Sequence, residues 1–264
     1  MKFTKPLLAS ILLLFFMLWA PLGQTEFLVQ HWMKIGTFAI PFLLIGSFSF
    51  LDIDKSSELA KDFRFMALLL LFTYVIHQFE EHWVDLFGNH YAFYSFNNRF
   101  ILEILGQPQS DIVPLTKKSI YAINTSLVWL VGLLAVLRSP KHLFPFFAMA
   151  GIMLINGLVH LASGIAKFQY NPGLLTSIVL FIPLYFWTMK QARHRVSRYK
   201  IYLVTGIIWA FLAHVIMVAG LLLANWYGVF SEPLYWVVLV VWSIVPLTIL
   251  KDDHLTRTLS DQKN

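Results

Sequence analysis

Residues 66–86 read MALLLLFTYVIHQFEEHWVDL, and this stretch sets the character of the chain. Its first half is almost entirely apolar, whereas its second half carries two histidines and two glutamates. A bilayer core of about 30 Å is crossed by roughly 20 mainly apolar residues in a helix. The stretch therefore predicts a membrane-spanning helix that carries ionisable side chains.

The composition of the whole chain supports the same class. Of its 264 residues, 58% are hydrophobic and 13% are charged, and the mean hydropathy is +0.67. A soluble domain has roughly 25% charged residues, and disordered chains combine low hydrophobicity with high net charge. Transmembrane barrels show short alternating strands rather than long apolar runs. We therefore expect an all-α, polytopic transmembrane helical bundle that forms a single domain over residues 1–264.

Long apolar runs predict about eight transmembrane helices. Their approximate bounds are 6–22, 35–51, 66–86, 119–137, 144–166, 174–189, 202–224 and 234–250. The first run resembles a signal peptide, but Pro21 directly after the small residue Ala20 predicts a retained helix. The one long connection, 87–118, predicts either an interfacial helix or lid with an amphipathic piece at Phe100–Leu105, or a plain surface loop.

The positions of Lys and Arg predict the orientation. If the helices alternate from a cytoplasmic N-terminus, fifteen of the twenty basic residues lie on the cytoplasmic side. The remaining five are Lys34, Arg99, Lys117, Lys118 and Lys167. The positive-inside rule then places both termini in the cytoplasm of a multi-pass protein, which we assign to a bacterial cytoplasmic membrane. The need to fix this orientation also explains the net charge of +6. The bilayer is therefore the expected partner, and nucleic acid is not. The oligomeric state stays open.

The strongest chemical signal is His77-Gln-Phe-Glu80-Glu81-His82. Each ionisable residue inside a membrane helix costs about 2.5–3.5 kcal/mol on insertion scales, so such residues need a reason. His77 and Glu81 lie one helical turn apart on one face, and Glu80 lies beside them, whereas His82 is expected to point away at the interface. An imidazole and carboxylates on one face can chelate a divalent cation, and the chain has no cysteine to offer instead.

Other predicted helices carry polar residues at a similar depth. Asn156 and His160 form an i, i+4 pair, and His214 lies on the seventh helix. With a rise of 1.5 Å per residue, His77 lies about 17 Å from the cytoplasmic end of its helix, and Glu81 and His160 about 23–24 Å. The third, fifth and seventh helices are therefore expected to converge on one polar site in the outer half of the bilayer.

These considerations predict a specific set of site residues. His77, Glu81 and His160 are the expected ligands of a divalent metal, zinc or iron/manganese, and Glu80 or Glu81 is the expected catalytic base. Further support for the ligands, or an additional ligand, is expected from Asn156, His214 and Tyr170. No other cofactor is expected.

The pattern resembles the HXXEE family of integral membrane proteins. The resemblance rests on His77-x-x-Glu80-Glu81, on Asn156-x-x-x-His160, and on Tyr170-Asn-Pro-Gly173 followed by an apolar helix. It covers about residues 65–187 as a core, with two further helices on each side. The family has no settled activity, and the resemblance implies a metal-dependent role through the motif itself.

Three functions stay open at this stage. The first is a metal-dependent membrane enzyme, hydrolytic, that acts on a lipid-like or membrane-embedded substrate. The second is a proton- or ion-coupled transporter, because buried glutamates beside histidine also build proton relays. The third is a non-catalytic membrane protein with a structural His–Glu–Asn network. The Asn171-Pro-Gly173 turn is either a plain tight turn or a device that orients Tyr170, Thr176 and Ser177 over the site.

Overall fold

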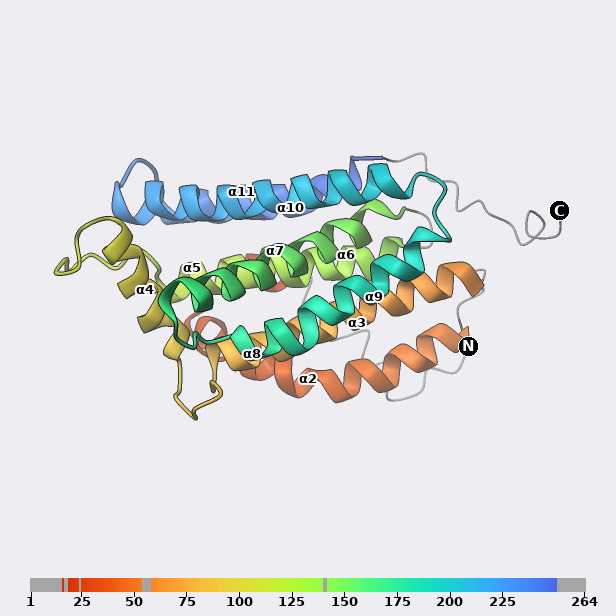
Figure 1. The fold of residues 1–264 in the computed structure, drawn as a ribbon, viewed down its shortest axis with the longest axis horizontal. Helices are drawn as coiled ribbons and strands as arrows, with labels where there is room; N and C mark the ends of the chain where they lie inside the picture. The colour runs from red at the N-terminus through yellow and green to blue at the C-terminus, as the bar shows by residue number, and fades with distance from the viewer. Residues whose placement is uncertain (1–15, 17–18, 24, 54–57, 140–141, 251–264) are drawn as a thin grey trace.

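The structure is a computed structural model that describes residues 16, 19–23, 25–53, 58–139 and 142–250 (Figure 1). Within these residues every regular element is a helix, and one isolated bridge joins Val84 to His90. The elements in chain order are η1 (Ala20–Leu22), α2 (Glu26–Ile53), α3 (Glu58–His82), α4 (Ala92–Ile104), α5 (Lys117–Ile123), η2 (Asn124–Leu130), α6 (Val131–Arg138), α7 (Phe144–Lys167), α8 (Leu174–Thr176), η3 (Ser177–Phe181), α9 (Ile182–Arg193), α10 (Tyr199–Leu221), η4 (Leu222–Trp226), α11 (Glu232–Ile244) and η5 (Val245–Leu247).

Several of these elements follow one another without a break and form longer helices that contain a wider, π-helical segment. The π-helical segments are η2, η3 and η4. With the flanking α-helical turns they form unbroken helices over 117–138, 174–193 and 199–226. Each of these matches one apolar run of the sequence.

Five helices of the described part are long and apolar enough to cross a membrane. They are Lys61–His82, Lys117–Arg138, Phe144–Lys167, Leu174–Arg193 and Tyr199–Trp226, and Glu232–Leu247 is a shorter apolar helix. The all-helical prediction is confirmed, and α2 begins earlier than the run predicted at 35–51. Most of the predicted helix 6–22 lies outside the described residues. The total of eight spans, the cytoplasmic termini and the bacterial membrane stay predictions.

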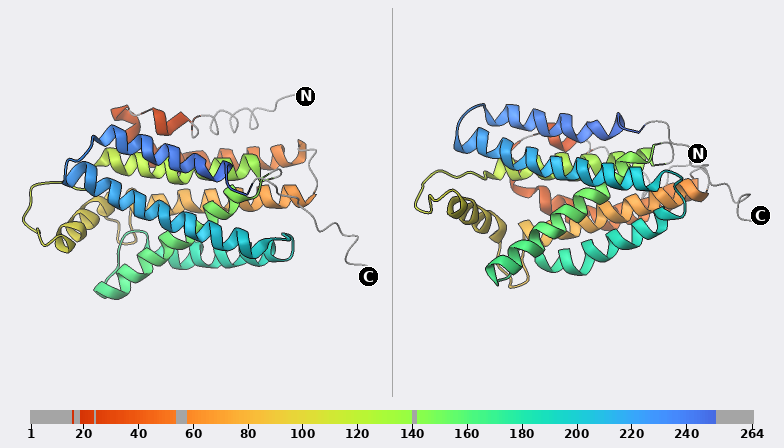
Figure 2. Two further views of the ribbon diagram at one scale, coloured as in Figure 1. Left: turned by 90° about the horizontal axis from the view of Figure 1, so that it is seen from above. Right: turned by 45° about the horizontal axis from the view of Figure 1, so that its top comes forward.

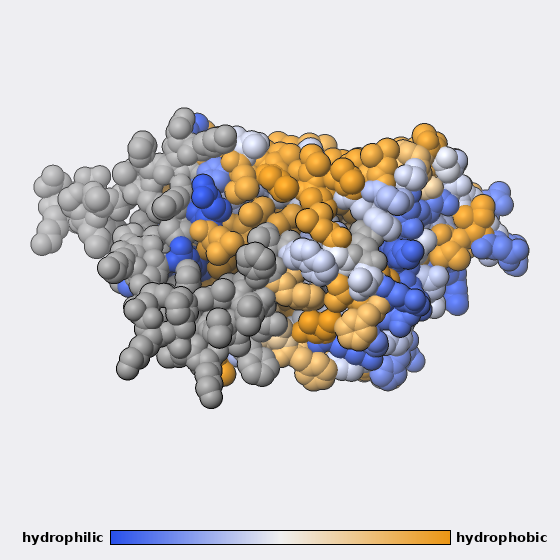
Figure 3. Space-filling model, turned by 180° about the vertical axis from the view of Figure 1, so that it is seen from behind, coloured by the Kyte–Doolittle hydropathy of each residue, from blue (hydrophilic) through white to orange (hydrophobic). Residues whose placement is uncertain are grey.

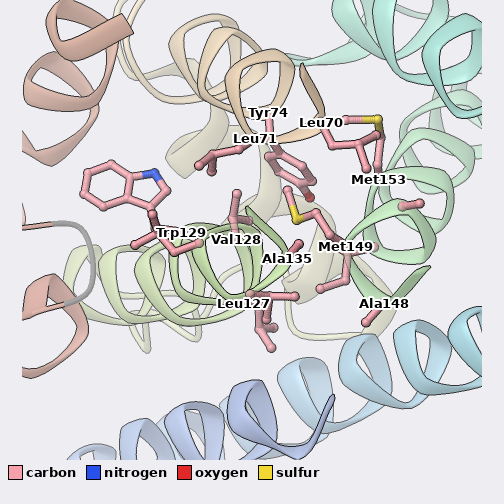
Figure 4. Close-up of a cluster of buried hydrophobic side chains, with 14 of the residues drawn as sticks. Leu70, Leu71, Tyr74, Leu127, Val128, Trp129, Ala135, Ala148, Met149 and Met153 are labelled. Carbon is pink, nitrogen blue, oxygen red and sulfur yellow. The ribbon is translucent and has the colours of Figure 1, made fainter. Parts of the chain in front are cut away.

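The helices run side by side along the long axis of the molecule, and α4 with its loops lies at one end (Figures 1 and 2). At the centre α3 packs against α6 and α7, while α2 covers α3 and α10 covers α7. Between these helices lies a dense apolar core, in which Leu70, Trp129, Met149 and Met153 are almost completely buried (Figure 4). The core holds α3 and α7 at a fixed spacing, and these are the helices that carry the candidate ligands.

Two glycines allow α7 and α10 to approach closely. A Cβ atom added to Gly151 would lie 2.6 Å from the carbonyl oxygen of Gly206, and one added to Gly206 would lie 2.8 Å from the carbonyl oxygen of Phe147. Small residues at helix contacts are the usual means of close packing in membranes, where burial of apolar surface supplies little driving force.

The outward face of α10 is apolar along its length. Val204, Ile208, Phe211, Val215 and Val218 are each 44–56% exposed. Figure 3 shows a hydrophobic band over the middle of the molecule, with hydrophilic residues gathered toward the α4 end. Exposed apolar surface of this extent is unusual for a soluble monomer and agrees with helices that face lipid.

The connection 87–118 contains a helix, so its interpretation as a plain loop is wrong. That helix, α4, starts at Ala92 rather than at Phe100, and none of its residues is buried. It ends before Gly106, which has a φ of +67°. The side chain of Asn98 ties it to the chain before α5, because Asn98 accepts a hydrogen bond from Leu115 N (2.9 Å) and donates one to Leu115 O (3.0 Å).

Candidate functional site

Three predicted ligands converge between α3 and α7. One oxygen of Glu81 lies 3.5 Å from Nε2 of His77, and the other lies 3.3 Å from Nε2 of His160. One ligand atom from each of the three residues can be chosen so that all lie within 4.8 Å of one another. The side chains are buried, at 0%, 5% and 7% exposure for His77, Glu81 and His160. The predicted convergence of the third and fifth helices is therefore observed.

The ring of His160 is oriented by Asn171. The amide nitrogen of Asn171 donates to the backbone carbonyl of His160 (3.0 Å), which leaves the amide oxygen to accept from His160 Nδ1 (2.7 Å). This arrangement assigns the proton of a neutral His160 to Nδ1. Its Nε2 then carries a lone pair directed at Glu81.

The ring of His77 is oriented in the same way by Thr176. The Thr176 hydroxyl donates to Glu80 (2.5 Å) and therefore accepts from His77 Nδ1 (2.7 Å). A neutral His77 is thus also protonated at Nδ1. Its Nε2 is buried and has no hydrogen-bond partner.

The two Nε2 atoms and the carboxylate thus meet with lone pairs facing each other. Such a meeting is repulsive unless a proton or a cation lies between the atoms. The separations of 3.3 and 3.5 Å exceed the 2.9–3.0 Å that is usual for an N–H···O hydrogen bond. Tetrahedral zinc with bonds of about 2.0–2.2 Å places its ligand atoms roughly 3.3–3.6 Å apart. The two separations involve different oxygens of Glu81, so it is the donor set of two imidazole nitrogens and a carboxylate, with ligand atoms within 4.8 Å, that fits a divalent metal.

Glu80 has a different environment from Glu81. One of its oxygens accepts from the Tyr170 hydroxyl (2.8 Å) and Leu175 N (3.1 Å), and the other accepts from Thr176 N (2.8 Å) and the Thr176 hydroxyl. Burial raises the pKa of the Tyr170 hydroxyl above its usual range, so this group stays protonated and donates. Glu80 thus anchors the chain before η3 to α3, and its predicted role as a catalytic base stays a prediction.

Gly173 brings the turn 171–173 against both histidines. It has a φ of +96°, and an added Cβ would lie 2.7 Å from Cε1 of His77 and 2.7 Å from Cε1 of His160. Only glycine combines this backbone conformation with this close an approach. The turn places Asn171 and Thr176 on the two histidines, so it orients the site rather than merely reversing the chain.

His82 lies inside the site region, and its predicted interfacial position is wrong. It is 4% exposed, and its Nε2 lies 3.0 Å from Glu81 and 3.2 Å from the amide nitrogen of Asn124. The reason is that α3 ends at His82, while α2 and α4 cover it, with Trp32 and Phe93 at ring distances of 5.2 and 4.5 Å. Helix periodicity carries no information about elements that pack on a helix end.

The other three predicted site residues, Tyr170, Asn156 and His214, do not contact the candidate ligands in the same way. Tyr170 is connected to them through Glu80. Asn156 donates to the Tyr74 hydroxyl (2.5 Å), and the Nδ1 of His214 pairs with the Ala210 carbonyl of its own helix (2.8 Å). Within the described residues, Asn156 and His214 make these hydrogen bonds rather than bonds to His77, Glu81 or His160, and both line the cavity described next.

An apolar cavity of about 310 Å³ extends from the ligands toward α4 and α10. Its polar end includes Glu81 and His160, and its walls include Phe93, Phe100, Val159 and Leu222. Val159 is 54% exposed, so the cavity wall reaches the lipid-facing surface. A mainly apolar cavity with a few convergent polar groups is typical of a small-molecule site, and its volume lies at the lower end of the usual range of about 300–1,000 Å³.

Comparison with known proteins found a similarity that covers the segment around the site. The chain matches no curated protein and no solved structure. Residues 68–188 match the model of a family described as a protein of unknown function with HXXEE motif, close to the predicted region 65–187. The segment that supplies all three candidate ligands and the turn over them is thus similar to the HXXEE family.

Proposed function

We propose that this protein is a metal-dependent membrane enzyme that hydrolyses a lipid-like substrate. His77, Glu81 and His160 hold one divalent transition metal, either zinc or iron/manganese. Two histidines and one carboxylate are a ligand set of catalytic metal sites, which keep a further position open for water or substrate. The apolar cavity that ends at Glu81 and His160 supports a substrate with a hydrocarbon part.

The observation that carries the proposal is the unsatisfied Nε2 of His77. A purely structural network satisfies its donors and acceptors, as the neighbouring Gln78 shows. Gln78 donates to Asn124 (2.9 Å) and accepts from the Trp129 indole (2.9 Å). His77, one residue earlier, has a ring fixed by Thr176 and a buried Nε2 that lies 3.5 Å from Glu81 without a hydrogen-bond partner among the described residues. This difference favours a ligand role for His77.

The chemistry needs water and no other reactant. The bond that is cleaved joins an acyl or phosphoryl centre to an alcohol oxygen. The hydroxyl of water bonds to that centre, and the remaining proton of water leaves with the alcohol. A metal at the site would polarise that centre and activate the water. Asn171 and Thr176 hold the imidazoles, and the apolar walls exclude bulk water from the reacting end.

The direct test is the metal content of the purified full-length protein. We expect about one equivalent of a single transition metal in the wild type and very little in the double variant His77→Ala, Glu81→Ala, because two of three ligands are lost. His214→Ala is the matched control, since its imidazole pairs with its own helix. Equal, substoichiometric metal in wild type and double variant would refute the proposal.

Glu80→Gln tests the positioning role of Glu80. We expect metal affinity to fall about 10–100-fold, as is usual when a group that orients ligands is lost. We also expect a loss of roughly 1–3 kcal/mol in stability, because the new amide nitrogen faces groups that donate. Isothermal titration of the stripped protein and thermal unfolding measure the two effects.

Glu103→Gln is the control for that experiment. Glu103 lies on α4 and pairs at the surface with Lys167 (2.5 Å), and exposed ion pairs contribute about 0–1 kcal/mol. If Glu80→Gln behaved like Glu103→Gln in both measurements, the anchoring role of Glu80 would be wrong.

A further inference from the structure

A second pocket opens at the α4 end of the bundle, between α2, α4 and the start of α5. Its volume is about 500 Å³. We call it the vestibule, and the lining residues used below are His31, His82, His90, Tyr94, Ser95 and Lys117. No Asp or Glu is among the described residues that line it. The nearest acid on α2 is Glu26, which accepts a hydrogen bond from Gln30 (3.1 Å). The vestibule therefore offers side chains that can donate hydrogen bonds, and one ammonium group.

The vestibule and the apolar cavity share a wall. His82 and Ile120 line both of them. The helix α4 also contributes to both, with Tyr94 and Ser95 toward the vestibule and Phe93 toward the cavity. The ring of Phe93 packs on His82 at 4.5 Å, so the partition is one layer of side chains thick. No residue of α4 is itself buried, although Phe93, Tyr94 and Ile101 pack against the core.

The partition lies directly beside the candidate metal ligands. Nε2 of His82 is 3.0 Å from Glu81. On the cavity side of His82 the lining is mainly apolar. On the vestibule side the lining includes hydrogen-bond donors and the charge of Lys117. Among the described residues, no carboxylate lines the vestibule beside Lys117, whereas Glu232 lies on the α11 side and accepts hydrogen bonds from Thr116 and Ser119. A lysine ammonium that faces the vestibule favours an anionic group there.

We propose that the site takes a single-chain amphiphile with an anionic head. Its tail occupies the apolar cavity, its head occupies the vestibule, and the bond between them lies beside Glu81. The reaction at that bond rests on the proposed function above, but the binding does not, because the candidate metal ligand His77 lines neither space. An anionic head has the same chemistry as free phosphate, so the test below compares the amphiphile with inorganic phosphate.

The chain contains no cysteine, so single introduced cysteines report on each compartment. Ser95→Cys reports on the vestibule, and Val218→Cys reports on the cavity, which Val218 lines at 47% exposure. Val237→Cys on α11 is the control for simple partition into lipid, since Val237 is 56% exposed and lines neither space. The full-length protein in phosphatidylcholine nanodiscs is alkylated with a maleimide in the presence of dodecyl phosphate, dodecanol or inorganic phosphate.

We expect dodecyl phosphate to slow alkylation severalfold at both Ser95→Cys and Val218→Cys, and to leave Val237→Cys unchanged. In the Ser95→Cys background, Lys117→Gln is expected to raise the concentration for half-protection about tenfold, because a charge-assisted contact is lost. Lys118→Gln is the matched control, since its exposed side chain does not line the vestibule.

Three results would overturn the proposal. Equal protection by dodecanol would show that the head is not recognised, and full protection by inorganic phosphate would show a site for free anions. Equal slowing at Val237→Cys would show partition into the bilayer only. The same assay in a His77→Ala background is expected to give unchanged protection, because His77 lines neither space, so a failure of metal binding is distinguishable from a failure of amphiphile binding.

Discussion

Replacing Gly173 by alanine is expected to abolish metal binding while the helical bundle stays folded. The new Cβ would lie 2.7 Å from Cε1 of both His77 and His160, so at least one ring must leave its position. In addition, the φ of +96° costs an L-residue about 1–2 kcal/mol. The measurements are metal content and the thermal unfolding midpoint of the purified protein.

Gly106→Ala separates the two expected causes of metal loss, which are backbone strain and collision with the histidine rings. Gly106 also has a positive φ, +67°, but a Cβ there would meet nothing within 4 Å. This control therefore carries the backbone strain without the collision, and we expect it to keep its metal. Full metal content in Gly173→Ala would show that the turn does not press on the two histidines, and the geometry described for the site would be wrong.

Replacing Gly151 by alanine is expected to give the largest loss of stability among single methyl additions. The methyl group would meet the backbone carbonyl of Gly206 at 2.6 Å, and a backbone atom cannot rotate away. The helices α7 and α10 must then separate, and overpacking of this kind costs about 1–3 kcal/mol. Because His160 lies on α7, we also expect weaker metal binding. Thermal unfolding and metal titration measure both effects.

Gly157→Ala is the control on the same helix. Its Cβ would lie 3.4 Å from that of Phe181, which is ordinary contact, and alanine favours a helix over glycine by about 1 kcal/mol. We therefore expect unchanged or slightly higher stability. If Gly151→Ala were as stable as Gly157→Ala, the close approach of α7 and α10 would not be a constraint on the fold.

Much of the fold follows from local properties of the chain. The run 66–86 predicted α3, and the runs 144–166 and 202–224 predicted α7 and α10, because hydropathy and length are read residue by residue. Helix ends were less well predicted. The start of α2 at Glu26 lies in a stretch with charged and polar residues, which hydropathy does not assign to a helix.

The ligand set was also predictable, for a similar reason. His77 and Glu81 share a helix face through their i, i+4 spacing, and the depth of His160 follows from its distance along its own helix. Scarcity of charge made these residues stand out. The structure places their ligand atoms together, as the shared depth predicted.

The roles of the surrounding residues were decided by tertiary structure. Glu80 and Glu81 are neighbours with the same side chain, but Glu80 accepts hydrogen bonds from Leu175 and Thr176, about one hundred positions away in the chain. The burial of His82 depends on α2 and α4 covering the end of α3.

The sequence by itself therefore determined the all-helical class, most of the helices that are long and apolar enough to cross a membrane, and the residues that could hold a metal. Those properties depend on hydropathy and on helical spacing within one element. Only the tertiary structure decided that Glu80 binds the chain at Leu175 and Thr176, which nitrogen of each imidazole is free, and that a turn built on Gly173 presses on both rings. These properties arise from contacts between segments far apart in the chain, and no local pattern encodes them.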